Sequence, residues 1–89
     1  MKIIRVSATW CTSCIVTYSD FLSCQKKYPE YEYIEYDYDM DEDVVKSFQI
    51  GDIIPVLIAI DKNGKEVSRL VGEKKEKDII AWVEQVKKL

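Results

Sequence analysis

The sequence contains no histidine. This absence excludes nucleophilic catalysis by a Cys–His pair, proton relays through imidazole, and zinc sites with histidine ligands. Any chemistry must therefore come from thiols, carboxylates, lysine, tyrosine or backbone groups.

Basic residues are not in excess, and long apolar runs are missing. The 13 lysine and arginine residues face 16 acidic ones, a net charge of −3. A protein that follows nucleic-acid phosphates needs a basic surface, so we expect no nucleic acid partner. No apolar run approaches the ~18 residues of a membrane span, and the first ten residues lack the features of a signal peptide. We therefore expect no membrane partner and a cytoplasmic protein.

Cysteine is scarce as well, with three in the chain. In a compartment that keeps thiols reduced, a few cysteines are more often catalytic, metal-binding or buried than joined in structural disulfides. In "TWCTSCIV", Cys11 and Cys14 stand three positions apart. They are either a reactive dithiol, part of a metal site, or two small buried residues. A zinc site needs four ligands and only Cys24 remains, so no metal site is expected unless two subunits share it.

The remaining pattern predicts an α/β fold. Apolar residues make up 47% of the chain and charged residues 33%, which is typical of a globular protein with one modest core. Four strands are predicted at residues 2–7, 31–39, 54–61 and 66–72. Three helices are predicted at residues 14–27, 40–50 and 74–88. The order β-α-β-α-β-β-α predicts a mixed four-stranded sheet with helices on both faces.

This element order resembles the thioredoxin superfamily over nearly the whole chain, residues 1–89, as a single thioredoxin-like domain. The likeness lies in "WCTSC" after the first strand, in "IIPV" at the third strand, and in Gly72 at the end of the fourth. Trp10 before the first cysteine is similar to the family's Trp-Cys-Gly-Pro-Cys motif. The N-terminal strand and helix of full thioredoxins have no counterpart here.

The two cysteines have complementary expected roles. Cys11 would lie at the start of a helix, where backbone N–H groups and the helix dipole favour a thiolate at the surface. Cys14, one turn further on, would lie beneath it. We expect Cys11 to attack a partner disulfide and Cys14 to resolve the mixed disulfide. Cys24 lies on the apolar stripe of the first helix, where a buried, inert thiol is expected.

The resemblance implies a cis-proline at Pro55 and a substrate-docking groove around it. In the family, the backbone N–H and C=O of the residue at Ile54 pair with an extended substrate segment, as in strand addition. Trp10, Ile54 and Gly72 would line this groove. Two simpler interpretations stay open here: a proline that merely opens a strand, and a tryptophan that belongs to the core.

Two departures from the family pattern stand out. Thr12 and Ser13 replace Gly-Pro between the cysteines, and their hydroxyls would donate to the Cys11 sulfur and favour its reduced form. Arg5 stands where the family has a buried aspartate, and Glu35 where it has a lysine. If the two meet, Glu35 would accept the proton of Cys14 and Arg5 would lower thiol pKa values. In the simpler interpretation, Arg5 reaches solvent and Glu35 is a surface residue.

These features predict a monomeric thiol–disulfide oxidoreductase without a cofactor beyond its own Cys11–Cys14 disulfide. Its partners would be proteins with disulfides and an electron donor similar to thioredoxin reductase. A glutaredoxin-like, glutathione-linked enzyme is the first alternative. A redox-sensing or metal-binding adaptor that does not catalyse turnover is the second.

Overall fold

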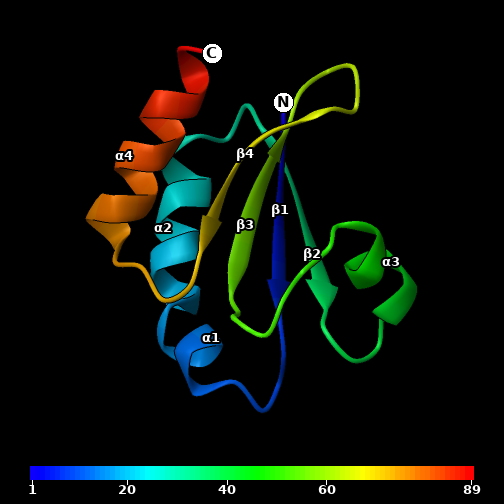
Figure 1. Cartoon of the computed structure of the whole chain (residues 1–89). Coiled ribbons are helices and arrows are strands. Elements are labelled where there is room, and N and C mark those ends of the chain that lie inside the picture. Colours follow the sequence, from blue (N-terminus) through cyan, green and yellow to red (C-terminus); the bar gives the residue numbers. More distant parts are fainter.

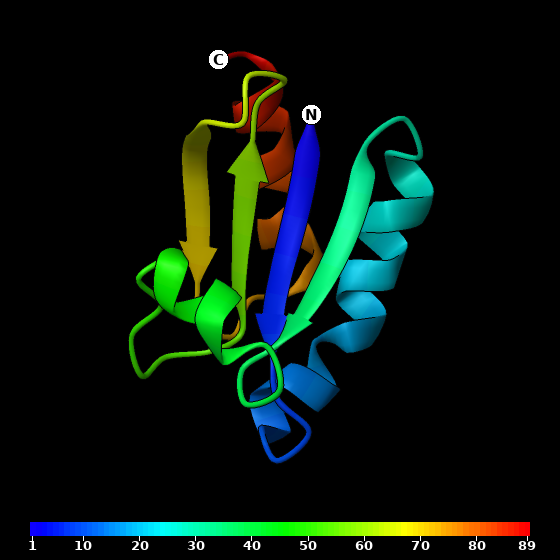
Figure 2. The same ribbon diagram turned by 90° about the vertical axis from the view of Figure 1, so that its right-hand side faces the viewer.

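The computed structural model describes residues 1–89 and contains one sheet with four strands. The strands are β1 (Lys2–Ser7), β2 (Glu32–Asp37), β3 (Val56–Ile60) and β4 (Glu66–Val71). They lie in the order β2-β1-β3-β4, which Figure 2 shows nearly face-on. β1 runs parallel to β2 and antiparallel to β3, and β3 runs antiparallel to β4.

Helices cover both faces of this sheet. They are α1 (Thr12–Val16), α2 (Tyr18–Lys27), α3 (Glu42–Ser47) and α4 (Glu76–Lys87). α1, α2 and α4 lie on one side of the sheet and α3 on the other (Figure 1). The predicted mixed sheet with helices on both faces is confirmed. None of these helices combines the length and the apolar character that crossing a bilayer requires.

The burial of each strand follows from its sequence. Every residue of β3, "VLIAI", is buried, as expected for a β-branched run with helices over both faces. β2, "EYIEYD", lies at the edge, and its side chains are half-buried or exposed. Hydrophobic side chains form one cluster between the sheet and α2 and α4, and a second on the α3 side. The second cluster includes Cys11 and Cys14, so the cysteines are fixed by core packing.

The helix predicted over residues 14–27 is in fact two helices, which meet at Thr17. Thr17 has φ −89° and ψ 0°, and its Oγ1 donates to the Ser13 carbonyl at 2.7 Å. Such back-bonding by threonine bends helices. The Arg5 guanidinium also donates to the Cys14 carbonyl at 2.6 Å, just before the bend. The prediction of one continuous helix was therefore wrong. The sequence pattern of this segment does not include the hydrogen bond that Arg5 of β1 makes next to the bend.

The core of the α3 side gives a direct test of packing. Ile58 in β3 is fully buried, so Ile58→Ala should lower the free energy of unfolding by about 2–5 kcal/mol. The matched control Ile53→Ala removes the same atoms from a side chain that is 61% exposed. It should change the free energy of unfolding by about 0.5 kcal/mol or less. Urea denaturation measures both, and equal losses would contradict this packing.

Candidate active site

Cys11 lies between β1 and α1, at the end of the sheet where β1 ends and β3 begins. It is the N-cap residue of α1, with φ −90° and ψ 109°. Its Sγ accepts a hydrogen bond from the Cys14 N–H at 3.1 Å. A sulfur thus occupies the place that a serine or aspartate oxygen usually takes at a helix start. This bond brings Cys11 and Cys14 together.

The Cys11 residue is only 7% exposed, which corrects the expectation of an open sulfur at the surface. Its Sγ lies 3.8 Å from the carbonyl oxygen of Ile54, to which the thiol donates, and Ala8 and Ile54 pack in the same cluster. The neighbours Trp10 and Thr12 are exposed. The sulfur therefore lies just beneath the surface, covered by the segment that precedes Pro55.

Cys14 is more deeply buried than Cys11. Burial raises the pKa of the Cys14 thiol to about 11, and the neighbouring Cys11 adds to the rise. A backbone hydrogen bond with Ala8 and the positive charge of Arg5 act in the opposite direction, lowering the pKa. At neutral pH Cys14 is therefore a thiol that must lose its proton before it can attack another sulfur.

The peptide bond between Ile54 and Pro55 is cis, as the resemblance implied. The Pro55 carbonyl accepts a hydrogen bond from the Gly72 N–H at 2.9 Å, so the end of β4 lies beside the proline. Gly72 has φ +91°, a conformation that favours glycine. A Cβ added to Gly72 would lie 3.6 Å from Cγ2 of Ile53. Pro55 and Gly72 are thus joined next to Cys11.

The model of the family described as Thioredoxin matches residues 1–85. The chain belongs to the thioredoxin family. An H-type thioredoxin of Picea mariana is 37% identical over 70 residues, which cover 79% of this chain and 54% of that protein. The chain spans about half the length of the curated thioredoxins it matches.

Solved thioredoxin structures agree with this assignment. A thioredoxin of Fasciola hepatica superposes with a TM-score of 0.85 at 25% identity, covering 94% of this chain and 78% of that one. Thioredoxin NaTrxh from Nicotiana alata also gives 0.85, at 26% identity, with 94% and 70% coverage.

The apolar surface beside this thioredoxin motif differs in part from the prediction. Trp10 is 62% exposed, so the interpretation of Trp10 as a core residue was wrong. Its Nε1 donates to Oδ2 of Asp39 at 2.5 Å, and its ring stands edge-on to Tyr38. Ile54 is buried, whereas Ile53 is exposed. Any apolar contact at this position is therefore made by the Ile53 side chain, and Ile54 offers only its backbone.

Sequence reasoning did not name three residues near the site: Asp39, which binds Trp10, and the exposed side chains of Ile53 and Val71. The two isoleucines before Pro55 are identical, so the sequence carries no signal for which one points outward. The acidic end of the predicted strand 31–39 was a signal for Asp39, because parallel strands end at the same edge of a sheet and Cys11 follows the end of β1.

The hydroxyls between the cysteines do not act as predicted. Thr12 is exposed and Ser13 half-buried, and neither hydroxyl donates to the Cys11 sulfur. The bond to that sulfur comes instead from the Cys14 backbone, because Cys11 is the N-cap.

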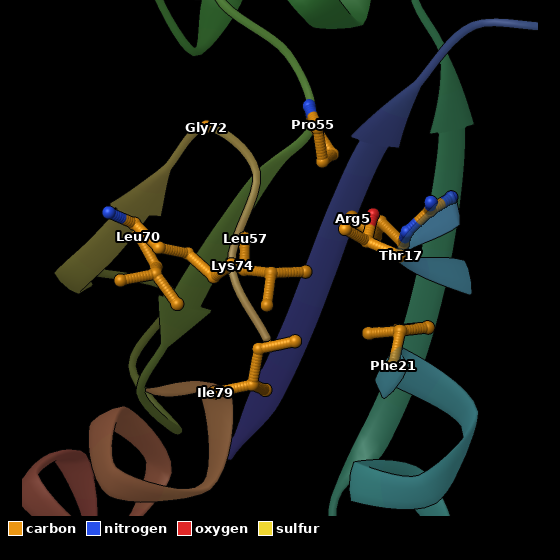
Figure 3. A pocket seen from close by; sticks show the side chains of 9 residues that line it. All are labelled: Arg5, Thr17, Phe21, Pro55, Leu57, Leu70, Gly72, Lys74 and Ile79. Atoms are coloured by element: carbon orange, nitrogen blue, oxygen red, sulfur yellow. The ribbon is translucent and has the colours of Figure 1, made fainter. Parts of the chain in front are cut away.

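Arg5 and Glu35 are register neighbours on β1 and β2, and their side chains form an ion pair. Arg5 is only 3% exposed, so the interpretation that it reaches solvent was wrong. Figure 3 shows its side chain directed from β1 toward Thr17, at the rim of a cavity of about 10 Å³, roughly the room for one water. Arg5, Glu35 and Cys14 also line a separate open hollow of about 260 Å³. The role of Glu35 as a proton acceptor stays a prediction.

Cys24 is almost fully buried on α2, as expected, and burial raises the pKa of its thiol to about 11. The three cysteines are free thiols. No group of three or more His, Cys, Asp or Glu side chains is arranged to hold a metal ion.

The raised pKa of Cys14 predicts how its alkylation by iodoacetamide depends on pH. A thiol with a raised pKa stays protonated until the pH approaches that value, so Cys14 should remain unmodified at pH 7–8 and react as the pH nears 11. Cys11 should be labelled before Cys14, and Cys24 serves as a buried control with a similar pKa. Mass spectrometry of peptides from each pH reports the order. Equal labelling of Cys11 and Cys14 at pH 7 would contradict the assignment.

Proposed function

We propose that this chain is a thiol–disulfide oxidoreductase that reduces protein disulfides through Cys11 and Cys14. The observation that carries the proposal is the position of the Cys11 sulfur. It accepts the Cys14 N–H and lies against the carbonyl of Ile54, next to the cis-proline. Membership of the thioredoxin family supports the same chemistry.

The reaction has two exchanges. The Cys11 thiolate attacks one sulfur of the partner's disulfide; that S–S bond breaks, and the electron pair goes to the leaving sulfur, which takes up a proton. Cys14 then loses its proton and attacks the Cys11 sulfur. The second partner thiolate leaves, and the chain holds a Cys11–Cys14 disulfide. Two electrons have passed to the partner.

The surface around Cys11 is suited to an extended polypeptide. The Ile54 backbone can pair with such a segment. The exposed apolar side chains of Trp10, Ile53 and Val71 belong to the segments next to Cys11 and Pro55. Thr12, Ser13 and Gly72 complete the docking area as predicted contacts.

The remaining features of the proposed enzyme follow from this cycle. The dithiol itself carries the electron pair, so no further cofactor takes part. A donor similar to thioredoxin reductase returns the chain to the reduced form, and residues 1–89 act as a monomeric single domain. A cytoplasmic location fits because that compartment keeps free thiols reduced.

An insulin-reduction assay tests this function. With thioredoxin reductase and NADPH as electron source, the chain should accelerate the precipitation of reduced insulin, and a variant with Cys11→Ser and Cys14→Ser should not. Turnover only in a glutathione-coupled assay would instead favour the glutaredoxin-like alternative. Absence of turnover in both assays would contradict an oxidoreductase.

Trapping separates the roles of the two thiols. Cys14→Ser should accumulate a mixed disulfide between Cys11 and an insulin chain, because the resolving thiol is missing. Non-reducing gel electrophoresis should show the complex, and dithiothreitol should release it. Cys11→Ser should form no comparable complex. If Cys11→Ser traps insulin equally well, the attacking and resolving thiols have been exchanged in this assignment.

The docking surface is tested with a pair of isoleucines of similar exposure. Ile53→Ser should raise KM for insulin by about fivefold, which corresponds to the loss of about 1 kcal/mol of apolar contact, with kcat little changed. Ile15 is 65% exposed but lines the hollow beside Glu35. Ile15→Ser should therefore leave KM within about twofold. Equal effects of the two substitutions would place the docking surface elsewhere.

A further inference from the structure

Arg5 carries a charge at a place where an unpaired charge would be costly. It lies in the middle of β1, and its guanidinium donates to the Glu35 carboxylate and to the Cys14 carbonyl. The rings of Tyr18 and Phe21 lie 5.3 and 5.5 Å from its central carbon. A buried ion is retained only when partners satisfy it, and these four groups do so.

We propose that Arg5 is a positioning residue for Cys14: anchored by Glu35, it holds the Cys14 carbonyl at the bend between α1 and α2 and aligns the second thiol for attack on the Cys11 mixed disulfide. This inference rests on the proposed thiol–disulfide exchange.

The geometry of the bend supports this role. Arg5 uses two nitrogens of one planar group: Nη1 binds Glu35 on β2, and Nη2 binds the Cys14 carbonyl at 2.6 Å. Because the group is rigid, the two bonds fix each other's direction. Thr17 Oγ1 lies 3.5 Å from the same carbonyl. One guanidinium thus joins β1, β2 and the turn of helix that carries Cys14.

Among the charged groups around Cys14, Arg5 is the one that favours its thiolate. Cys11 from the N-cap, Glu35 and Asp37 from β2, and Arg5 from β1 are the charged or titratable groups near it, with Tyr18 from α2. Burial and Cys11 raise the pKa of Cys14, whereas the positive charge of Arg5 lowers it.

One oxygen of the Glu35 carboxylate, Oε2, accepts two hydrogen bonds. It binds the Arg5 guanidinium, and Oε2 accepts the Ser7 hydroxyl at 3.2 Å. The structure therefore assigns Glu35 the part of charge partner to Arg5. The proton of Cys14 leaves to water in the open hollow that Cys14, Arg5 and Glu35 line together.

A two-phase reaction with 5,5′-dithiobis(2-nitrobenzoate) isolates the step. In the first phase Cys11 attacks the reagent and releases one thionitrobenzoate; in the second, Cys14 loses its proton and attacks Cys11, releasing another. Absorbance at 412 nm follows both rates. Arg5→Met should leave the first rate within about twofold and slow the second at least about threefold. The expected loss combines a tenfold drop in thiolate per pKa unit with the higher nucleophilicity of a more basic thiol.

Two further variants sharpen the comparison. Arg5→Lys keeps the charge but not the planar fork, so its second phase should lie between wild type and Arg5→Met. Arg69 on β4 is a matched control. Its guanidinium also binds a glutamate, Glu66 of the same strand, and a backbone carbonyl, that of Phe48 at the end of α3. Arg69→Met should leave both phases within about twofold.

The pH profile and Glu35→Gln separate positioning from proton transfer. The pH midpoint of the second phase should rise in Arg5→Met and less in Arg5→Lys, a shift that a general loss of packing would not produce. Glu35→Gln keeps a side-chain oxygen that can accept from Arg5, so its second rate should fall by less than about 1.5-fold. A loss in Glu35→Gln as large as that in Arg5→Met would overturn the assignment and make Glu35 the proton acceptor.

The failure of this inference is distinct from the failure of the proposed function. If wild type shows no second phase, the exchange reaction itself is wrong. If wild type shows both phases and neither Arg5 variant changes the second, only the role of Arg5 is overturned. Circular dichroism melts confirm that each variant folds, and Arg5→Lys carries the test if Arg5→Met does not fold.

Discussion

The hydrogen bond from the Cys14 N–H to the Cys11 sulfur determines the arrangement of this site. It exists because the chain leaves β1, the strand between β2 and β3, and turns into a helix within four residues. Capping through sulfur sets the direction of Cys11, and helical geometry then places Cys14 one turn behind it. The segment with the cis-proline returns to the same end of the sheet and covers Cys11. The positions of the two thiols therefore depend on the strand order and on where α1 begins.

The two thiols differ because their surroundings differ. Cys14 is held protonated by burial, with Arg5 as a partial counterweight, whereas Cys11 meets a backbone donor and lies just under an apolar surface. The buried cation is the unusual part of this design. The resemblance implies an acid at that position of β1, and here the acid is on β2, with the basic group between it and the thiol. The sign of the buried charge is reversed, but a charge pair next to the second cysteine is retained.

Local signals in the sequence predicted most of the fold and the position of the cysteine pair. The spacing of Cys11 and Cys14 and the residue patterns of the predicted strands and helices depend on neighbours along the chain. The bend at Thr17 could not be predicted because it involves Arg5, which is twelve residues away in the chain. Which of the Ile53 and Ile54 side chains is exposed could not be predicted for a similar reason: only packing against the sheet decides which one is buried.

The edge position of β2 has a consequence for self-association. One side of this strand leaves peptide groups without a neighbouring strand, and such edges can pair with the edge of another copy. Glu32 and Asp37 place negative charge along it, while Glu35 is paired with Arg5, so two copies that approach edge to edge repel each other. Acidic solutions neutralise carboxylates, and salt screens them. The chain's colloidal behaviour is therefore coupled to acidity and ionic strength through one strand, independently of its thiols.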